Sequence, residues 1–192
     1  MLTLVYKNKG DKKMLENIIW TLFGLFCLNR FILWITFFKK GKFGKYGTIV
    51  IIINHITSFC LPLVSQPRLG LDIFWRIVGV IVFIIGIFIM KIADDEFHKM
   101  RIRPDTITTK LITTGVYSRV RHPIYLGNNI YFMGWSLTWS ATYCFYLIPL
   151  IIFLNWLQAV LEEKYILEKE FGDEYREYKK NVGMFLPKIV KR

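Results

Sequence analysis

The stretch IVGVIVFIIGIFIM (Ile77–Met90) contains no charged residue and lies within a longer apolar segment, Ile73–Ala93. A helix needs about 20 apolar residues to cross the hydrocarbon core of a bilayer. This segment is therefore predicted to be a transmembrane helix. The whole chain has the same character, because 54% of its 192 residues are hydrophobic and its mean hydropathy is +0.37.

Further apolar blocks predict about five spans in all. The other four predicted spans are Leu15–Phe38, Tyr46–Val64, Ile124–Trp139 and Tyr143–Leu161. The last two are separated by only a few residues, so they must form a tight antiparallel hairpin. After Leu161, apolar residues recur at helical intervals among charged ones, which predicts an amphipathic interfacial helix kinked at Gly172. The predicted fold is all-α: a single multi-pass transmembrane bundle over residues 1–192, with the amino-terminal spans in 1–93.

The net charge of +12 would ordinarily suggest a nucleic-acid partner. Here the cations flank apolar blocks, where they mark the cytoplasmic side and attract anionic lipids, so membrane lipids are predicted as partners and nucleic acid is not. Residues 91–121 carry seven Lys and Arg and the tail after Leu161 carries eight, which places both in the cytoplasm. Four amino-terminal lysines oppose this orientation, so the first block either crosses against the rule or does not cross fully.

Two polar segments are candidates for a ligand site. The loop TGVYSRVRHPIYLG (Thr114–Gly127) combines a turn glycine, two arginines, a histidine and a proline that begins the next helix. Helix amino termini present unpaired N–H groups to anionic ligands. The alternative is a cytoplasmic loop that is basic only because topology requires it. The second segment, Glu162-Glu163, could bind a cationic group or simply neutralise the arginines of the loop.

Together, the two segments resemble a known family. Gly115–Gly127 is similar to the S-adenosylmethionine motif of isoprenylcysteine carboxyl methyltransferases and related phospholipid methyltransferases, and the tail from Glu162 to Pro187 is similar to their carboxy-terminal signature. The resemblance covers about residues 94–190. It implies a cytoplasm-facing pocket for S-adenosylmethionine, built from the loop, the helical hairpin and the carboxy-terminal helix of 94–192. A lipophilic or prenylated substrate would reach this pocket from the bilayer.

The resemblance also implies roles for individual residues. Glu163 would bind the amino group of the cofactor, and Leu111 and Ile112, with Lys110 beside them, would contact its adenosine. The residues implied to line the rest of the cofactor are Tyr117, His122, Pro123, Ile124 and Tyr125. Arg121, His122 and Tyr125 are the candidate catalytic residues: the arginine as a holder of the acceptor, the other two as a base or as groups that orient the cofactor. No metal site is predicted.

One departure from the family leaves the acceptor open. Carboxyl methyltransferases of this family carry an arginine one helical turn before the cofactor-binding glutamate, where this chain has Ala159. Arg121 or Arg30 could compensate for the lost ion pair. The alternative acceptors are a phospholipid amine or another small lipophilic compound. Two other classes also compete: an NADPH-dependent enzyme similar to sterol reductases, and a non-catalytic membrane protein that binds anionic lipid.

Overall fold

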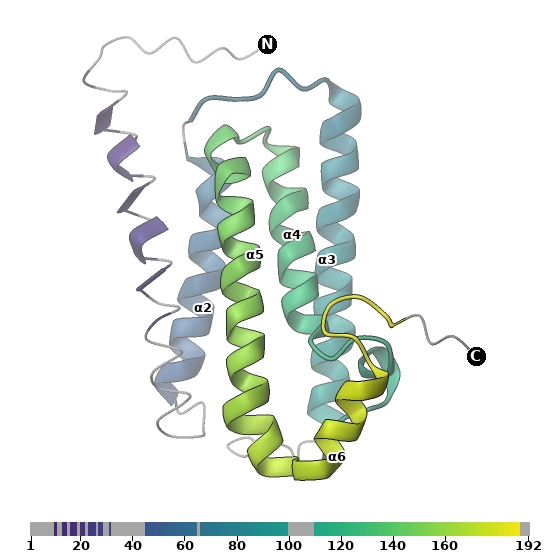
Figure 1. The fold of residues 1–192 in the computed structure, drawn as a ribbon. Helices are drawn as coiled ribbons and strands as arrows, with labels where there is room; N and C mark the ends of the chain where they lie inside the picture. The colour runs from purple at the N-terminus through teal and green to yellow at the C-terminus, as the bar shows by residue number, and fades with distance from the viewer. Residues whose placement is uncertain are drawn as a thin grey trace.

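The computed structural model describes residues 45–64, 66–99 and 110–188, together with some of the residues between 10 and 31. The elements are α2 (Lys45–Cys60), η1 (Leu61–Leu63), α3 (Ile73–Lys99), η2 (Gly115–Ser118), α4 (Pro123–Thr138), α5 (Thr142–Glu162), η3 (Glu163–Leu167) and α6 (Glu168–Asn181). Helices α2 to α5 run side by side, and α6 turns back at one end of this bundle (Figure 1). The described segments contain two isolated bridges and otherwise only helices and loops. The all-α prediction is confirmed.

Four of the five predicted spans are helices close to their predicted bounds. Helix α4 begins at Pro123, inside the polar loop, with His122 as its N-cap residue. A proline is well suited to this first helical position, because the N–H that it lacks would have no partner there. Helices α4 and α5 form the predicted hairpin, and the turn between them places Ser140 at φ 51°. The first predicted span, Leu15–Phe38, lies largely outside the described residues.

Two described helices are long and apolar enough to cross a membrane. They are α3 and the continuous helix Thr142–Asn181, in which an 18-residue window reaches a mean hydropathy of 2.7 and 2.0, respectively. The outer face of α3 exposes large apolar side chains such as Ile84 and Phe88, which water would disfavour and lipid would not. Of the continuous helix, only α5 is apolar, because charged residues begin at Glu162. The protein is therefore a membrane protein.

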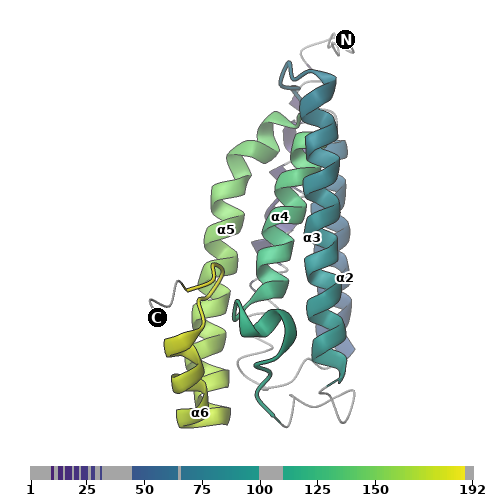
Figure 2. The same cartoon turned by 90° about the vertical axis from the view of Figure 1, so that its right-hand side faces the viewer.

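Helices α3 and α4 pack with their backbones in contact. Each carries two glycines seven residues apart on the facing side: Gly79 and Gly86 on α3, Gly127 and Gly134 on α4. A Cβ atom at Gly86 would lie 2.3 Å from the backbone nitrogen of Tyr131, and one at Gly134 would lie 2.2 Å from that of Phe83. Small residues of this kind are what allow membrane helices to approach closely. Figure 2 shows α3 and α4 closely aligned, while α5 diverges from them.

At the end of the bundle opposite the turn between α4 and α5, two bends place α6 against the other helices (Figure 1). Helix α5 continues into the π-helical turn η3, and α6 contains Gly172 at φ 52° and ψ −123°. A side chain would be strained in that conformation, which glycine adopts readily. The kink predicted at Gly172 is confirmed. Together the bends direct the second half of α6 and the following tail toward the start of α4 (Figure 1).

Candidate functional site

The tail after α6 pairs directly with the polar loop that precedes α4. Val120 and Gly183 form a parallel bridge, the backbone N–H of Arg121 donates to the carbonyl of Gly183 at 2.8 Å, and that of His122 donates to Met184 at 3.1 Å. These bonds fix the backbone just before α4. Segments about 60 residues apart in sequence therefore form one unit at this end of the molecule.

Glu163 lies at the centre of this unit. Its Oε1 atom is 2.8 Å from Nε of Arg121 and 3.1 Å from Nε2 of His122, and its Oε2 atom is 3.0 Å from Nζ of Lys179. The residue is 1% exposed. Burial acts to raise the pKa of Glu163, but hydrogen bonds from His122 and Arg121 outweigh it and hold the pKa at about 2. The carboxylate is therefore ionised and can only accept, so the histidine ring donates an N–H to it.

Arg121 connects three segments. Besides its bond to Glu163, its guanidinium donates to the backbone carbonyls of Val182 and Lys179, the latter at 3.3 Å. These carbonyls lie at the carboxy-terminal end of α6, where cations are favoured. The side chain is buried and engaged within the protein. This arrangement favours a positioning role for Arg121 over contact with an acceptor.

Tyr125 lies one turn into α4 and pairs with the neighbouring glutamate. Its hydroxyl donates to Oε2 of Glu162 at 2.8 Å, and its ring stacks on that of His122 at a centroid distance of 5.6 Å. Because the hydroxyl bonds Glu162 and the imidazole bonds Glu163, both side chains of the loop motif are held by the acidic pair at the end of α5. The predicted proximity of the two motifs is thus present as direct contact.

Two tyrosines of α6 also contact the chain that precedes α4. The hydroxyl of Tyr178 donates to the carbonyl of Tyr117 at 2.5 Å, and Leu111 packs against Tyr175 and Tyr178. The Tyr175 hydroxyl is buried close to the Glu163 carboxylate. Burial, and next the Glu163 carboxylate, raises the pKa of Tyr175, so it is a neutral hydroxyl near the charged cluster.

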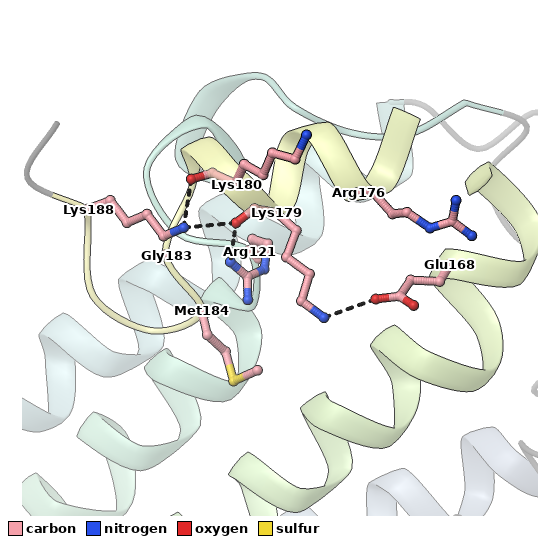
Figure 3. Close-up of a pocket in the computed structure, with 8 residues that line it drawn as sticks. All are labelled: Arg121, Glu168, Arg176, Lys179, Lys180, Gly183, Met184 and Lys188. Atoms are coloured by element: carbon pink, nitrogen blue, oxygen red, sulfur yellow. Dashed lines mark hydrogen bonds and ion pairs between the residues drawn. The ribbon is translucent and has the colours of Figure 1, made fainter. Parts of the chain in front are cut away.

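The remaining predicted residues differ in how deeply they are buried. Ile112 and Pro123 are buried, Ile124 is partly buried, and Lys110 is exposed. Beside the cluster, a groove of about 550 Å³ faces outward (Figure 3). Its lining residues are Arg121, Glu168, Arg176, Lys179, Lys180, Gly183, Met184 and Lys188. Of the predicted site residues, only Arg121 is part of this lining.

Lys179 is the residue of the cluster that the sequence prediction missed. It bridges Glu163 and Glu168 at 3.0 and 2.9 Å. Among eight cations in the tail, nothing in the sequence distinguishes this lysine. The π-helical turn and the Gly172 kink lie between it and Glu163, so the spacing of an ideal helix does not bring the two together.

Acidification is expected to destabilise the protein through Glu163. The pKa of this carboxyl is lowered from 4.5 to about 2 in the folded state, so its ion pairs contribute stability above the unfolded value that is lost as the pH falls through that window. The melting temperature in detergent, followed from about pH 6 to about pH 3, should fall less steeply in Glu163→Gln than in the wild type. Equal slopes in both proteins would contradict this assignment.

Comparison with known proteins places these residues in a family. A family model described as "Protein of unknown function (DUF1295)" matches residues 40–182. A probable protein-S-isoprenylcysteine O-methyltransferase of Oryza sativa subsp. indica is 31% identical over 143 residues, which cover 72% of this chain and 72% of the relative. The chain belongs to the protein-S-isoprenylcysteine O-methyltransferase family.

Other members of the family are also similar to this chain. The protein-S-isoprenylcysteine O-methyltransferase of Homo sapiens is 28% identical over 144 residues, covering 73% of this chain and 51% of the human protein. That of Saccharomyces cerevisiae is 41% identical over 87 residues, covering 41% of this chain and 33% of the yeast protein. The predictions of the family and of a methyltransferase are confirmed. The enzyme therefore requires a methyl donor.

Proposed function

We propose that this enzyme transfers a methyl group from S-adenosylmethionine to the carboxylate of a prenylated cysteine. The proposal rests on family membership and on one observation: the contact between His122 of the loop motif and Glu163 of the tail motif, at 3.1 Å. This contact joins the two segments that the resemblance assigns to the cofactor. The relatives are named for this reaction on isoprenylcysteine.

Two features of the site suit the proposed donor, which bears a primary ammonium and a sulfonium. The Glu163 carboxylate already holds a primary ammonium, that of Lys179. Near it lies the buried Tyr175 hydroxyl, a neutral group whose pKa is raised by burial and by the Glu163 carboxylate. The residues proposed to hold the donor are Glu163 with Lys110, Leu111, Ile112, Tyr117, His122, Pro123, Ile124 and Tyr125.

The residues around the donor would act by orientation and by exclusion of water. When bound, the donor supplies an electrophilic methyl group on its sulfonium. A carboxylate acceptor is already ionised and needs no general base, which agrees with the commitment of His122 to Glu163 and of Tyr125 to Glu162. Methyl transfer from a cation to an anion neutralises charge, so a site shielded from water lowers the barrier, and alignment of the reactants lowers it further. Tyr117, Tyr175 and Tyr178 would provide that shielding.

Ala159 limits which methyl acceptors the site can bind. This residue is fully buried on α5, one turn before Glu163, and it cannot form an ion pair with a carboxylate. Arg121 is engaged by Glu163 and by two carbonyls, and Arg30 lies outside the described residues. Ala159 therefore favours a second candidate function, methylation of a phospholipid amine or of another small lipophilic compound by the same donor site.

The proposed setting is a bundle of about five spans with the donor site toward the cytoplasm. The cationic loop before α4 and the cationic tail lie at the same end of the molecule, as the pairing of Val120 with Gly183 requires. Cationic ends of this kind face the cytoplasm. We place residues 1–192 in one domain, in which 1–93 provides spans and 94–192 the donor site.

Thermal shift of the detergent-purified protein tests the donor. S-Adenosylhomocysteine at about 100 times its dissociation constant should add about 2.7 kcal/mol to the free energy of unfolding, and NADPH should add none. Stabilisation by NADPH alone would favour the reductase class, and no response to either would favour a non-catalytic lipid-binding protein. Transfer of radiolabelled methyl groups to a prenylcysteine analogue, compared with a membrane lipid extract, identifies the acceptor.

A further inference from the structure

Lys179 holds its ammonium between two carboxylates. Its Nζ atom lies 3.0 Å from Oε2 of Glu163 and 2.9 Å from Oε1 of Glu168. The lysine side chain is 42% exposed, whereas that of Glu163 is 2% exposed. A partly exposed amine of α6 thus reaches a buried acid. Lys179 also lines the groove shown in Figure 3, where it pairs with Glu168.

The two oxygens of Glu163 differ in how firmly they are held. Oε1 accepts from Arg121 and His122, whose side chains are 7% and 5% exposed. Breaking a buried pair of this kind is costly, because it leaves an uncompensated charge. Oε2 is held by Lys179, and an ion pair with an exposed partner contributes little stability. Oε2 is therefore the position at which a ligand ammonium can reach Glu163 without disrupting the buried cluster.

Lys179 also has a second ion-pair partner, Glu168. When it leaves Glu163 it can remain paired with Glu168, so its charge is not left unpaired. The groove beside it has a volume of about 550 Å³, room for the amino-acid end of a ligand. Arg176 and Lys180 in the same lining are exposed and paired with Asp173 and Glu177 of their own helix, and such surface pairs are weak enough for an α-carboxylate to compete for the two cations.

We propose that Lys179 occupies the ammonium subsite of the methyl donor, and that the α-ammonium of the donor displaces it onto Glu168. This inference rests on the proposed function, because it requires a donor with an α-amino group. Lys179 then competes with the donor for Glu163. The apparent affinity for the donor falls as the fraction of molecules in which Lys179 occupies Glu163 rises.

The substitution Lys179→Met tests the proposal, because the proposal predicts tighter rather than weaker binding of the donor. The methionine keeps the aliphatic stem and removes the ammonium, so S-adenosylhomocysteine should bind about fivefold more tightly than to the wild type. The affinity for 5′-methylthioadenosine, which lacks the amino-acid group, should not change. Lys169→Met removes the same charge from an exposed position of α6 outside the groove, and should leave both affinities at the wild-type values.

The outcomes separate this inference from the proposed function. If the wild-type protein does not bind S-adenosylhomocysteine, the proposed function fails and the inference fails with it. If the wild type binds but Lys179→Met binds no more tightly, or more weakly, the inference alone is overturned. Equal tightening of S-adenosylhomocysteine and 5′-methylthioadenosine would also overturn it. Tightening confined to S-adenosylhomocysteine, at an unchanged melting temperature, supports displacement.

Discussion

Glu163→Gln is expected to abolish donor binding and methyl transfer and to destabilise the protein. Glutamine has nearly the same shape but no charge, so the buried Arg121 loses its counter-ion, and Lys179 retains only Glu168. Removing one partner of a buried ion pair costs about 3–5 kcal/mol of folding free energy. The proposed ion pair with the donor's ammonium is lost as well, at about 2–5 kcal/mol of binding free energy, so the affinity for S-adenosylhomocysteine should fall about 100-fold or more. Isothermal titration and the melting temperature in detergent measure the two effects.

The matched control for this prediction is Glu170→Gln. Glu170 is an exposed acid of α6, so its replacement should leave affinity and melting temperature close to the wild-type values. Donor affinity within about twofold of the wild type in Glu163→Gln would mean that the carboxylate takes no part in the site.

Gly86→Val is expected to prevent folding or to lower the free energy of unfolding by about 3 kcal/mol or more, because the clash is with backbone that cannot move aside. The first added carbon alone would lie 2.3 Å from the backbone nitrogen of Tyr131 and 2.8 Å from the carbonyl oxygen of Gly127. The yield of monodisperse protein in detergent and its melting temperature report the effect.

Gly70→Val provides the comparison. Apart from Gly70 and its two chain neighbours, no atom of the described residues lies within 4 Å of the Cβ position at Gly70, which is in the loop before α3, so valine there should be tolerated. A Gly86→Val protein with the melting temperature of Gly70→Val would show that α3 and α4 are not in backbone contact.

Much of the fold follows from hydropathy. Helices α3 and α5 coincide with apolar blocks, and the Gly172 kink lies where a glycine interrupts an amphipathic pattern. The close approach of α3 and α4 was not predicted, although its signal is present: pairs of glycines seven residues apart in two neighbouring spans. Such spacing shows which face of a helix lacks side chains, but not which other helix packs on that face.

The site was predictable only in part. The resemblance assigned His122 and Glu163 to one cofactor pocket, and the structure places the two side chains in contact. Lys179 could not be assigned, because the π-helical turn η3 and the Gly172 kink alter the direction of the chain before it. Arg121 was expected to be available to an acceptor, but the tail carbonyls that engage it come from a segment whose path depends on those two bends.

The backbone contact between α3 and α4 has a consequence for how the site is held together. The glycine pairs fix these two helices against each other, and His122, the N-cap residue of α4, takes its position from that contact. The acids and Lys179 have a different support: α5, which diverges from α3 and α4 (Figure 2), and the chain that bends at η3 and Gly172. The ion pairs of Glu163 and the pairing of Val120 with Gly183 therefore join two separately supported halves of one site.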